Sequence, residues 1–139
     1  MTRHLWALLA PAALLWSLTA AAEMPGAVQT EIEGLLDSVS NSGCEFQRNG
    51  SWHSADAAAG HLRKKLQVIR LESGLRSAED FIDRVATRSS LSGQAYEVRC
   101  GNGAAIPTSL WLRLQLQQYR AKHFPGASTQ NRPEPRPGS

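Results

Sequence analysis

Three basic side chains in the middle of this 139-residue chain could together bind an anion: Arg48, His61 and Lys65. A guanidinium group holds a carboxylate or a phosphate through two parallel hydrogen bonds, and a histidine can bind an anion or exchange a proton near neutral pH. Four neutral side chains could add hydrogen-bonding groups: Asn49, Ser89, Ser90 and Ser92. These residue types predict an enzyme or an anionic-ligand receptor, provided that the fold brings them to one pocket.

Each of these residues also has an ordinary structural interpretation, which the sequence leaves open. Arg48 could extend its charge into water from the end of a strand, or pair with Asp56 or Asp80 of a neighbouring helix. His61 could be a hydrogen-bonded residue at the edge of the core, kept uncharged by Lys65. The three serines could satisfy the backbone where a helix ends and a strand begins. None of them lies in the Gly-x-Ser-x-Gly pattern of a catalytic serine, and the carboxylates form no clear acid and base pair.

Residues 1–22 have the three parts of a secretory signal peptide. Arg3 and His4 form a short basic start, a mostly apolar run follows up to Leu18, and Ala20-Ala21-Ala22 supplies the small residues of a processing site. The apolar run is shorter than the roughly 20 residues that a membrane-spanning helix needs. We therefore expect export, cleavage after Ala22 and no stable membrane span in the mature protein.

The other end of the chain predicts a disordered tail. Residues 124–139 are rich in proline, glycine and polar side chains, and they contain almost nothing that a core could bury. Residues 23–123 are then expected to form one small domain. The formal charge of +3 is spread thinly, without a dense basic patch that includes aromatic residues, so the composition does not favour nucleic acid as a partner.

Cys44 and Cys100 are the two cysteines of the chain, 56 positions apart. Export would place them in an oxidising compartment, where a disulfide is the usual state. They do not form a Cys-x-x-Cys motif, and neither they nor His53, His61 and His123 have the spacing of metal ligands. We therefore expect a structural disulfide, no metal and no cofactor.

Helical and alternating patterns predict an α+β fold of about four helices and a small antiparallel β-sheet, with one disulfide. The expected helices cover residues 27–41, 55–70, 77–88 and 108–122. Residues 44–48 and 51–53 are expected to form two strands joined by Asn49-Gly50, the pair that a type I′ turn favours. A further strand over residues 94–100 should face the same core as the strand that begins at Cys44.

The last predicted helix carries apolar side chains on two sides. Leu110, Trp111 and Leu114 lie on one side, and Leu112, Leu116 and Tyr119 lie roughly opposite. A helix that neighbours cover on both sides has this pattern. A helix that presents an apolar strip to another periplasmic protein, or to a second copy of the chain, has it too.

Two sequence blocks carry a resemblance to a known family. The first is Cys-x-Phe-x-Arg-Asn-Gly from Cys44, and the second is Ser-Ser-x-Ser-Gly-x-x-Tyr-x-Val-x-Cys from Ser89 to Cys100. With these blocks in this order, the chain resembles the YfeK-like family of short exported bacterial proteins, a domain of unknown function, over residues 32–120. The resemblance implies a periplasmic location and a bond between Cys44 and Cys100, but no reaction, ligand or partner.

Two functions from different classes follow from these patterns. The sequence contains no recognisable set of catalytic residues, and the last helix has a second apolar side. Both observations favour a non-catalytic binding or protein-interaction module. The alternative is an enzyme or an anionic-ligand receptor with its site around Arg48, His61 and Lys65. The two differ in whether these side chains share a pocket.

Overall fold

A helix with one apolar side begins the part of the chain that the computed structural model describes, residues 24–126. This helix, α1 (Gly26–Ser40), buries four residues at intervals of three and four positions: Ile32, Leu35, Leu36 and Val39. It confirms the helix predicted over residues 27–41. The predicted signal peptide, residues 1–22, and residues 127–139 of the predicted tail lie outside the described residues.

A hairpin follows α1 and contains the predicted tight turn. Strands β1 (Glu45–Arg48) and β2 (Ser51–His53) pair antiparallel, with Phe46 opposite His53. Asn49 and Gly50 have φ angles of 51° and 82°, the left-handed values that both central residues of a type I′ turn require. The alternation along β1 places Phe46 and Arg48 on the same face of the sheet.

The sheet has two further strands, one of them not predicted. Strand β3 (Glu97–Arg99) pairs antiparallel with β1, and β4 (Ile106–Pro107) pairs antiparallel with β3, so the order is β2-β1-β3-β4. β3 is shorter than the strand predicted over residues 94–100. The reason is that the Tyr96 backbone bonds outside the sheet, to the Thr87 carbonyl and the Thr108 amide, at 2.9 Å each.

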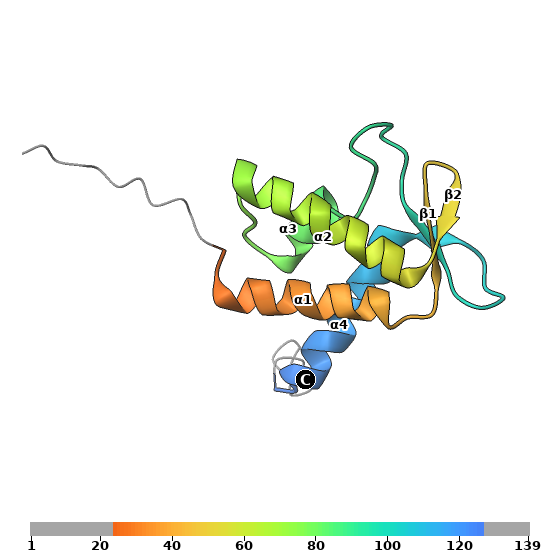
Figure 1. Ribbon diagram of the computed structural model, residues 1–139. Coiled ribbons are helices and arrows are strands. Elements are labelled where there is room, and N and C mark those ends of the chain that lie inside the picture. The colour runs from red at the N-terminus through yellow and green to blue at the C-terminus, as the bar shows by residue number, and fades with distance from the viewer. Residues whose placement is uncertain (1–23, 127–139) are drawn as a thin grey trace, which may run out of the picture.

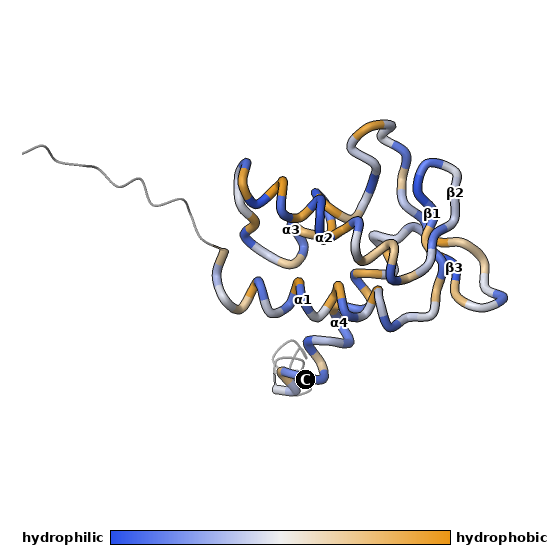
Figure 2. The backbone as a smooth tube through the Cα atoms, viewed as in Figure 1, coloured by the Kyte–Doolittle hydropathy of each residue, from blue (hydrophilic) through white to orange (hydrophobic). Residues whose placement is uncertain are grey.

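The second helix, α2 (Ala55–Glu72), has Ser54 as its N-cap and lies beside α1, with the β1–β2 hairpin at one end of the helices (Figure 1). The Ser54 hydroxyl accepts a hydrogen bond from the Ala57 amide at 3.2 Å. Ala59, Leu62 and Leu66 are its buried residues. Figure 2 shows orange turns alternating with blue turns along the helices, the pattern of helices with one apolar side.

The third helix, α3 (Ala78–Arg84), ends sooner than the predicted limit at residue 88. The Thr87 side chain donates to the Ile82 carbonyl at 2.7 Å, and Arg88 pairs with Ala95 in an isolated bridge, so the chain has already left the helix. At the start of α3 the Ser77 hydroxyl accepts from the Asp80 amide at 3.0 Å. This bond caps the N-terminus of the helix.

The fourth helix, α4 (Thr108–His123), buries only one of its two apolar sides. Leu112 and Leu116 belong to the core, whereas Leu110 and Leu114 remain 50% and 46% exposed. The Trp111 ring meets Phe46 edge-on, with 5.7 Å between ring centroids. The interpretation of α4 as a helix that neighbours cover on both sides is therefore wrong. The prediction that Leu112 and Leu116 belong to an exposed interaction surface is wrong as well, because both are buried.

An arginine of α4 connects three helices. The Arg120 guanidinium bonds to Glu31 of α1 at 2.8 Å and to Glu79 of α3 at 2.6 Å. Hydrogen bonds from Arg120 lower the pKa of the Glu79 carboxyl, because they stabilise its ionised form. Gly34 of α1 lies against the Tyr119 ring, where a Cβ atom would be 2.4 Å from the nearest ring carbon. The lack of a side chain at Gly34 thus permits the close approach of α1 and α4.

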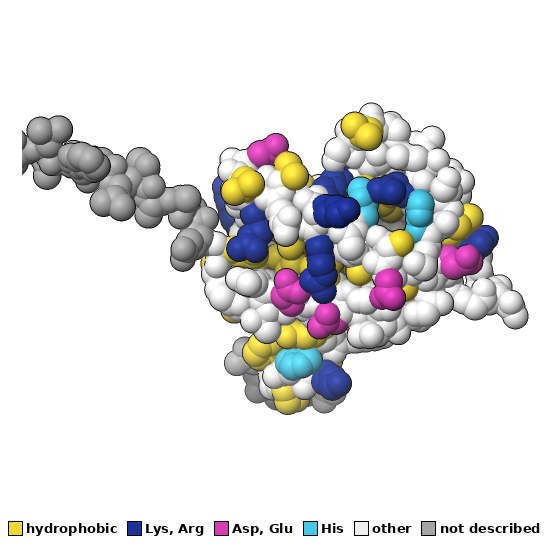
Figure 3. All heavy atoms as spheres, viewed as in Figure 1, with side chains coloured by type: hydrophobic (Ala, Val, Ile, Leu, Met, Phe, Trp, Pro, Cys, Tyr) yellow, Lys and Arg dark blue, Asp and Glu magenta, His cyan; other side chains and the backbone are white. Residues whose placement is uncertain are grey.

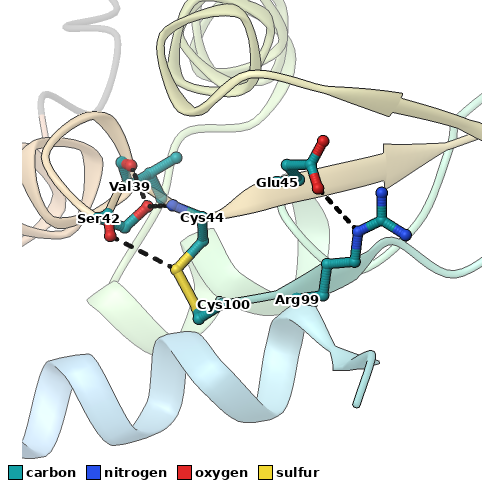
Figure 4. The surroundings of a disulfide bond; sticks show 6 residues. All are labelled: Val39, Ser42, Cys44, Glu45, Arg99 and Cys100. Carbon is teal, nitrogen blue, oxygen red and sulfur yellow. Dashed lines mark hydrogen bonds and ion pairs between the residues drawn. A yellow bond between two sulfur atoms is a disulfide. The ribbon is translucent and has the colours of Figure 1, made fainter. Parts of the chain in front are cut away.

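The predicted disulfide joins the ends of β1 and β3. Cys44 immediately precedes β1, Cys100 immediately follows β3, and their sulfur atoms are bonded (Figure 4). Beside the bond, Glu45 accepts from Arg99 at 2.8 Å across the strand pair, also drawn in Figure 4. The α+β prediction of four helices, a small antiparallel sheet and one disulfide is confirmed.

Candidate functional site

A cavity of about 70 Å³ lies between β1, β2 and the first half of α2. On the face drawn in Figure 3, histidine and basic side chains lie around a hollow. No carboxylate is among the residues that line this cavity, which are Phe46, Gln47, Arg48, His53, Ala57, Ala58, His61, Leu62, Tyr96 and Thr108. Four of these residues are apolar and the others carry polar groups, so the cavity combines apolar walls with hydrogen-bonding groups, as small-molecule sites do.

Arg48 and His61, the first two residues of the predicted site, converge in this cavity. Their Nη1 and Nδ1 atoms are 2.5 Å apart. A guanidinium can only donate, so His61 Nδ1 must accept and the ring hydrogen of the neutral form must sit on Nε2. The β1 alternation presents Arg48 to α2, and His61 borders the buried stripe at Leu62, so the two elements bring the side chains together.

The hydrogen-bond chain continues from His61 to Tyr96. His61 Nε2 lies 3.2 Å from the Tyr96 hydroxyl, and since this nitrogen carries the hydrogen, it donates and the hydroxyl oxygen accepts. The hydroxyl hydrogen of Tyr96 then has no acceptor among residues 24–126. Burial raises the pKa of the Tyr96 phenol, outweighing the opposing effect of the Arg48 charge, so the phenol stays a donor at neutral pH.

Thr108, the first residue of α4, adds a second unused donor. Its hydroxyl is buried and has no hydrogen-bond partner among the described residues, although the residue lines the cavity. A buried polar group without a partner costs about 1 to 3 kcal/mol. The Tyr96 hydroxyl and the remaining N–H groups of Arg48 make the cavity rich in donors, whereas the Thr108 hydroxyl itself is closed to solvent.

The His61 ring is uncharged at neutral pH. Its pKa lies below the ordinary value of 6.5, first because burial disfavours the charged form and then because the charges of Arg48 and Lys65 repel a proton. A neutral ring is also what the bond from Arg48 requires, since a protonated ring would have no acceptor nitrogen.

This lowered pKa predicts a loss of stability in mild acid. An unfolded chain takes up the His61 proton near pH 6.5, whereas the folded chain resists it, so the free energy of unfolding should fall as the pH drops below about 6.5 and through the lower folded-state pKa. Urea unfolding at pH values from 7.5 to about 5 measures the slope. His61→Gln should flatten this slope, because the variant has no imidazole to protonate at that position. An equal slope in His61→Gln would contradict the prediction.

Lys65, the third residue of the predicted site, does not line the cavity. Its Nζ atom donates to the Arg88 carbonyl at 2.5 Å and lies 5.2 Å from the centre of the Tyr96 ring. Burial, followed by the Arg88 charge, lowers its pKa. Lys65 therefore supports the wall that carries Tyr96, and it contributes positive potential to His61 rather than a direct contact with a ligand.

The predicted neutral donors lie in a loop cluster instead of the cavity. Ser92 donates to the Asn49 side chain at 2.5 Å, which ties the hairpin turn to the loop before β3. The Ser89 hydroxyl accepts from the amides of Leu91 and Ser92 at 3.3 Å each, and Ser90 is exposed. None of Asn49, Ser89, Ser90 and Ser92 lines the cavity, so their role as ligand donors is not supported by their position.

Tyr96 and Thr108 are the site residues that sequence reasoning missed. Tyr96 could have been found, because it shares the inward face of its predicted strand with Val98 and its hydroxyl would need a partner there. The sequence gave no reason to place Thr108 in the site, because its neighbours do not distinguish it from any other residue at the start of a helix. His53 also lines the cavity, from the end of β2.

Two other kinds of site are not seen in residues 24–126. No group of three or more His, Cys, Asp and Glu side chains gathers there in a way that could hold a metal ion. None of the helices in this range is long and apolar enough to cross a membrane.

The fold and the cavity define a small, disulfide-linked α+β domain with a donor-rich hollow between a hairpin and a helix. The chain belongs to a family of unknown function, DUF5329, whose family model matches residues 26–120. It is 36% identical over 85 residues to the uncharacterised protein YfeK of Salmonella typhimurium, an alignment that covers 60% of this chain and 69% of that protein. The predicted YfeK-like family is thus confirmed. No solved structure matches the chain significantly.

Proposed function

We propose that this protein is a non-catalytic binding module of the bacterial periplasm whose cavity receives an anionic group. The supporting observation is Arg48, a half-buried cation without a carboxylate partner among the described residues. Four described arginines pair with carboxylates, namely Arg63, Arg99, Arg113 and Arg120. The described arginines other than Arg48 that have no carboxylate partner are exposed to water; they are Arg70, Arg76, Arg84 and Arg88. A charge withdrawn from water is costly unless an opposite charge or hydrogen bonds compensate it, and an anionic ligand would do so.

The hydrogen bonds of the cavity favour an anion over a neutral or cationic ligand. Arg48 has N–H groups beyond the one bonded to His61, and the Tyr96 hydroxyl has an unused hydrogen. Anions accept hydrogen bonds without donating any, so they match such a set. A cation would meet the Arg48 charge with no lining carboxylate to offset it.

The same hydrogen bonds argue against catalysis by His61. A general base needs a free lone pair, but Nδ1 already accepts from Arg48, and Nε2 donates to Tyr96. The Tyr96 phenol has a raised pKa and therefore makes a poor nucleophile or base. These groups are arranged to hold a ligand, and we infer binding without chemical conversion.

The periplasmic location is part of the proposal. Its support is the apolar leader over residues 1–22, together with the disulfide, because such bonds persist in oxidising compartments. Protein interaction through α4 receives less support, because its exposed apolar side is reduced to Leu110 and Leu114.

The proposal predicts saturable anion binding that depends on Arg48. We expect the mature, disulfide-bonded protein to bind at least one of acetate, inorganic phosphate and sulfate, as followed by ¹H–¹⁵N NMR titration at pH 7 and constant ionic strength. Arg48→Gln keeps an N–H donor for His61 but removes the charge, and it should weaken binding by about tenfold or more, since a hydrogen bond to a charged group contributes about 1.5 to 3 kcal/mol.

Arg63→Gln is the matched control, because Arg63 is a surface arginine engaged by Glu33 and Asp37. It should bind the same anion as tightly as the unmodified protein. The proposal fails if none of the three anions binds, or if Arg48→Gln binds as well as Arg63→Gln.

A further inference from the structure

We propose that the anionic group is a monocarboxylate with a short apolar substituent, of about the size of propionate. This inference rests on the proposed function of the same cavity and names the class of ligand. Three features of the described residues carry it: the single permanent charge of the cavity, the arrangement of its donors, and its apolar walls.

The charge of the cavity matches a monoanion. Arg48 is the one permanently charged side chain among the lining residues, and the neighbouring His61 donates and accepts as a neutral ring. A phosphate monoester carries a charge of about −1.5 to −2 at pH 7. A partly desolvated site with one cation would leave much of that charge uncompensated, whereas a carboxylate is balanced by Arg48 alone.

The donors of the cavity suit the two oxygens of a carboxylate. A guanidinium can present two parallel N–H groups to a carboxylate, and Arg48 uses only one nitrogen, Nη1, for His61. The Tyr96 hydroxyl offers one further hydrogen. A carboxylate has about four lone-pair positions, enough to accept all of these donors.

The remaining walls are partly apolar and close together. Phe46, Ala58 and Leu62 line the cavity beside the donors, although Gln47 and His53 also contribute polar groups to its wall. The volume of about 70 Å³ is several times the roughly 10 to 15 Å³ that holds one water molecule, so the cavity has room for a small ligand. A carboxylate with two further carbons is a ligand of this size.

Such a carboxylate has two possible sources. It can belong to a free short-chain acid, or it can be the end of a longer chain whose remaining part stays outside the cavity. Acetyl-alanyl-alanine represents the second source, because its terminal alanine carries a carboxylate next to a single methyl group.

The test is an NMR titration of the mature protein at pH 7 with formate, acetate, propionate, propionamide, inorganic phosphate and acetyl-alanyl-alanine. We expect propionate to bind with a dissociation constant on the order of millimolar, as suits a ligand of this size. Affinity should rise about fourfold for each carbon from formate to propionate. Propionamide, which lacks the charge, and inorganic phosphate should each bind about tenfold more weakly or worse than propionate.

The outcomes separate this inference from the proposed function. Tighter binding of propionate supports a free acid as the ligand, and tighter binding of acetyl-alanyl-alanine supports a chain end; both support a monocarboxylate. Phosphate that binds as tightly as propionate, or affinity that stays flat from formate to propionate, would overturn the inference while leaving an anion site in place. If no anion binds, the inference and the proposed function are both overturned.

Discussion

Replacing both cysteines with serine is expected to lower the free energy of unfolding by about 4 kcal/mol. The bond joins residues separated by 56 positions, and cutting it releases a long loop in the unfolded chain. A domain of this size is stabilised by roughly 5 to 15 kcal/mol in total, so the change removes a large part of its stability. The pairing of β1 with β3 does not depend on the disulfide. We therefore expect the double variant to fold, so that its unfolding can be measured.

Urea unfolding at pH 7 measures this loss for the Cys44→Ser/Cys100→Ser variant. The unmodified protein under reducing conditions should show a similar loss, because it lacks the same link. Ser42→Ala serves as a control beside the bond, since it leaves the disulfide intact and removes two hydrogen bonds, one from the Cys44 amide and one to the Val39 carbonyl. It should cost about 1 to 3 kcal/mol, less than the double variant. A loss below about 1 kcal/mol in the double variant would show that the disulfide does not stabilise the domain.

Shortening a leucine on α4 is expected to destabilise the protein strongly on the buried side of the helix and only slightly on the exposed side. Leu112 is fully buried, and Leu112→Ala should lower the free energy of unfolding by about 2 to 5 kcal/mol, through lost burial and a residual cavity. Leu110 is 50% exposed, and Leu110→Ala should change stability by no more than about 1 kcal/mol. The comparison is closely matched, because the same substitution is made two residues apart in one helix.

Thermal or urea unfolding of the two variants decides which side of α4 faces the core. Size-exclusion chromatography with light scattering on both proteins checks that each stays in the same oligomeric state as the unmodified chain. If Leu110→Ala is as damaging as Leu112→Ala, the exposed side of α4 is covered in solution.

Local patterns were sufficient to predict most of the fold. The intervals of Ile32, Leu35 and Val39 predicted α1, and Asn49-Gly50 predicted the hairpin turn, because each depends on neighbours within a few residues. The strand faces also followed from alternation. This placed Cys44 and Cys100 where a bond could form.

Features that depend on distant parts of the chain could not be predicted in the same way. The two-residue strand β4 exists because β3 lies beside it, and α3 ends early because the following residues bond to the loop near Ala95. The apolar pattern of α4 has two sides, and nothing local to the helix indicates that Leu112 faces the core while Leu110 faces solvent.

The candidate site was predicted only in part. Arg48 and His61 were recognised from residue type, but their contact depends on how α2 crosses β1, which no local pattern gives. Lys65 was expected at the same place, and it turns to the Arg88 carbonyl, because the loop before β3 passes within its reach. The Tyr96 and Thr108 hydroxyls enter the site from two further segments, and only the tertiary structure brings them together.

The most direct test of the anion site follows the arginine side chains themselves during a titration. In ¹H–¹⁵N spectra that resolve the arginine Nε–Hε groups, addition of propionate to the mature protein should shift the Arg48 resonance saturably and leave those of Arg63 and Arg113 almost unchanged. Equal shifts at all three arginines, or no shift at Arg48 while the others move, would contradict an anion site between the hairpin and α2.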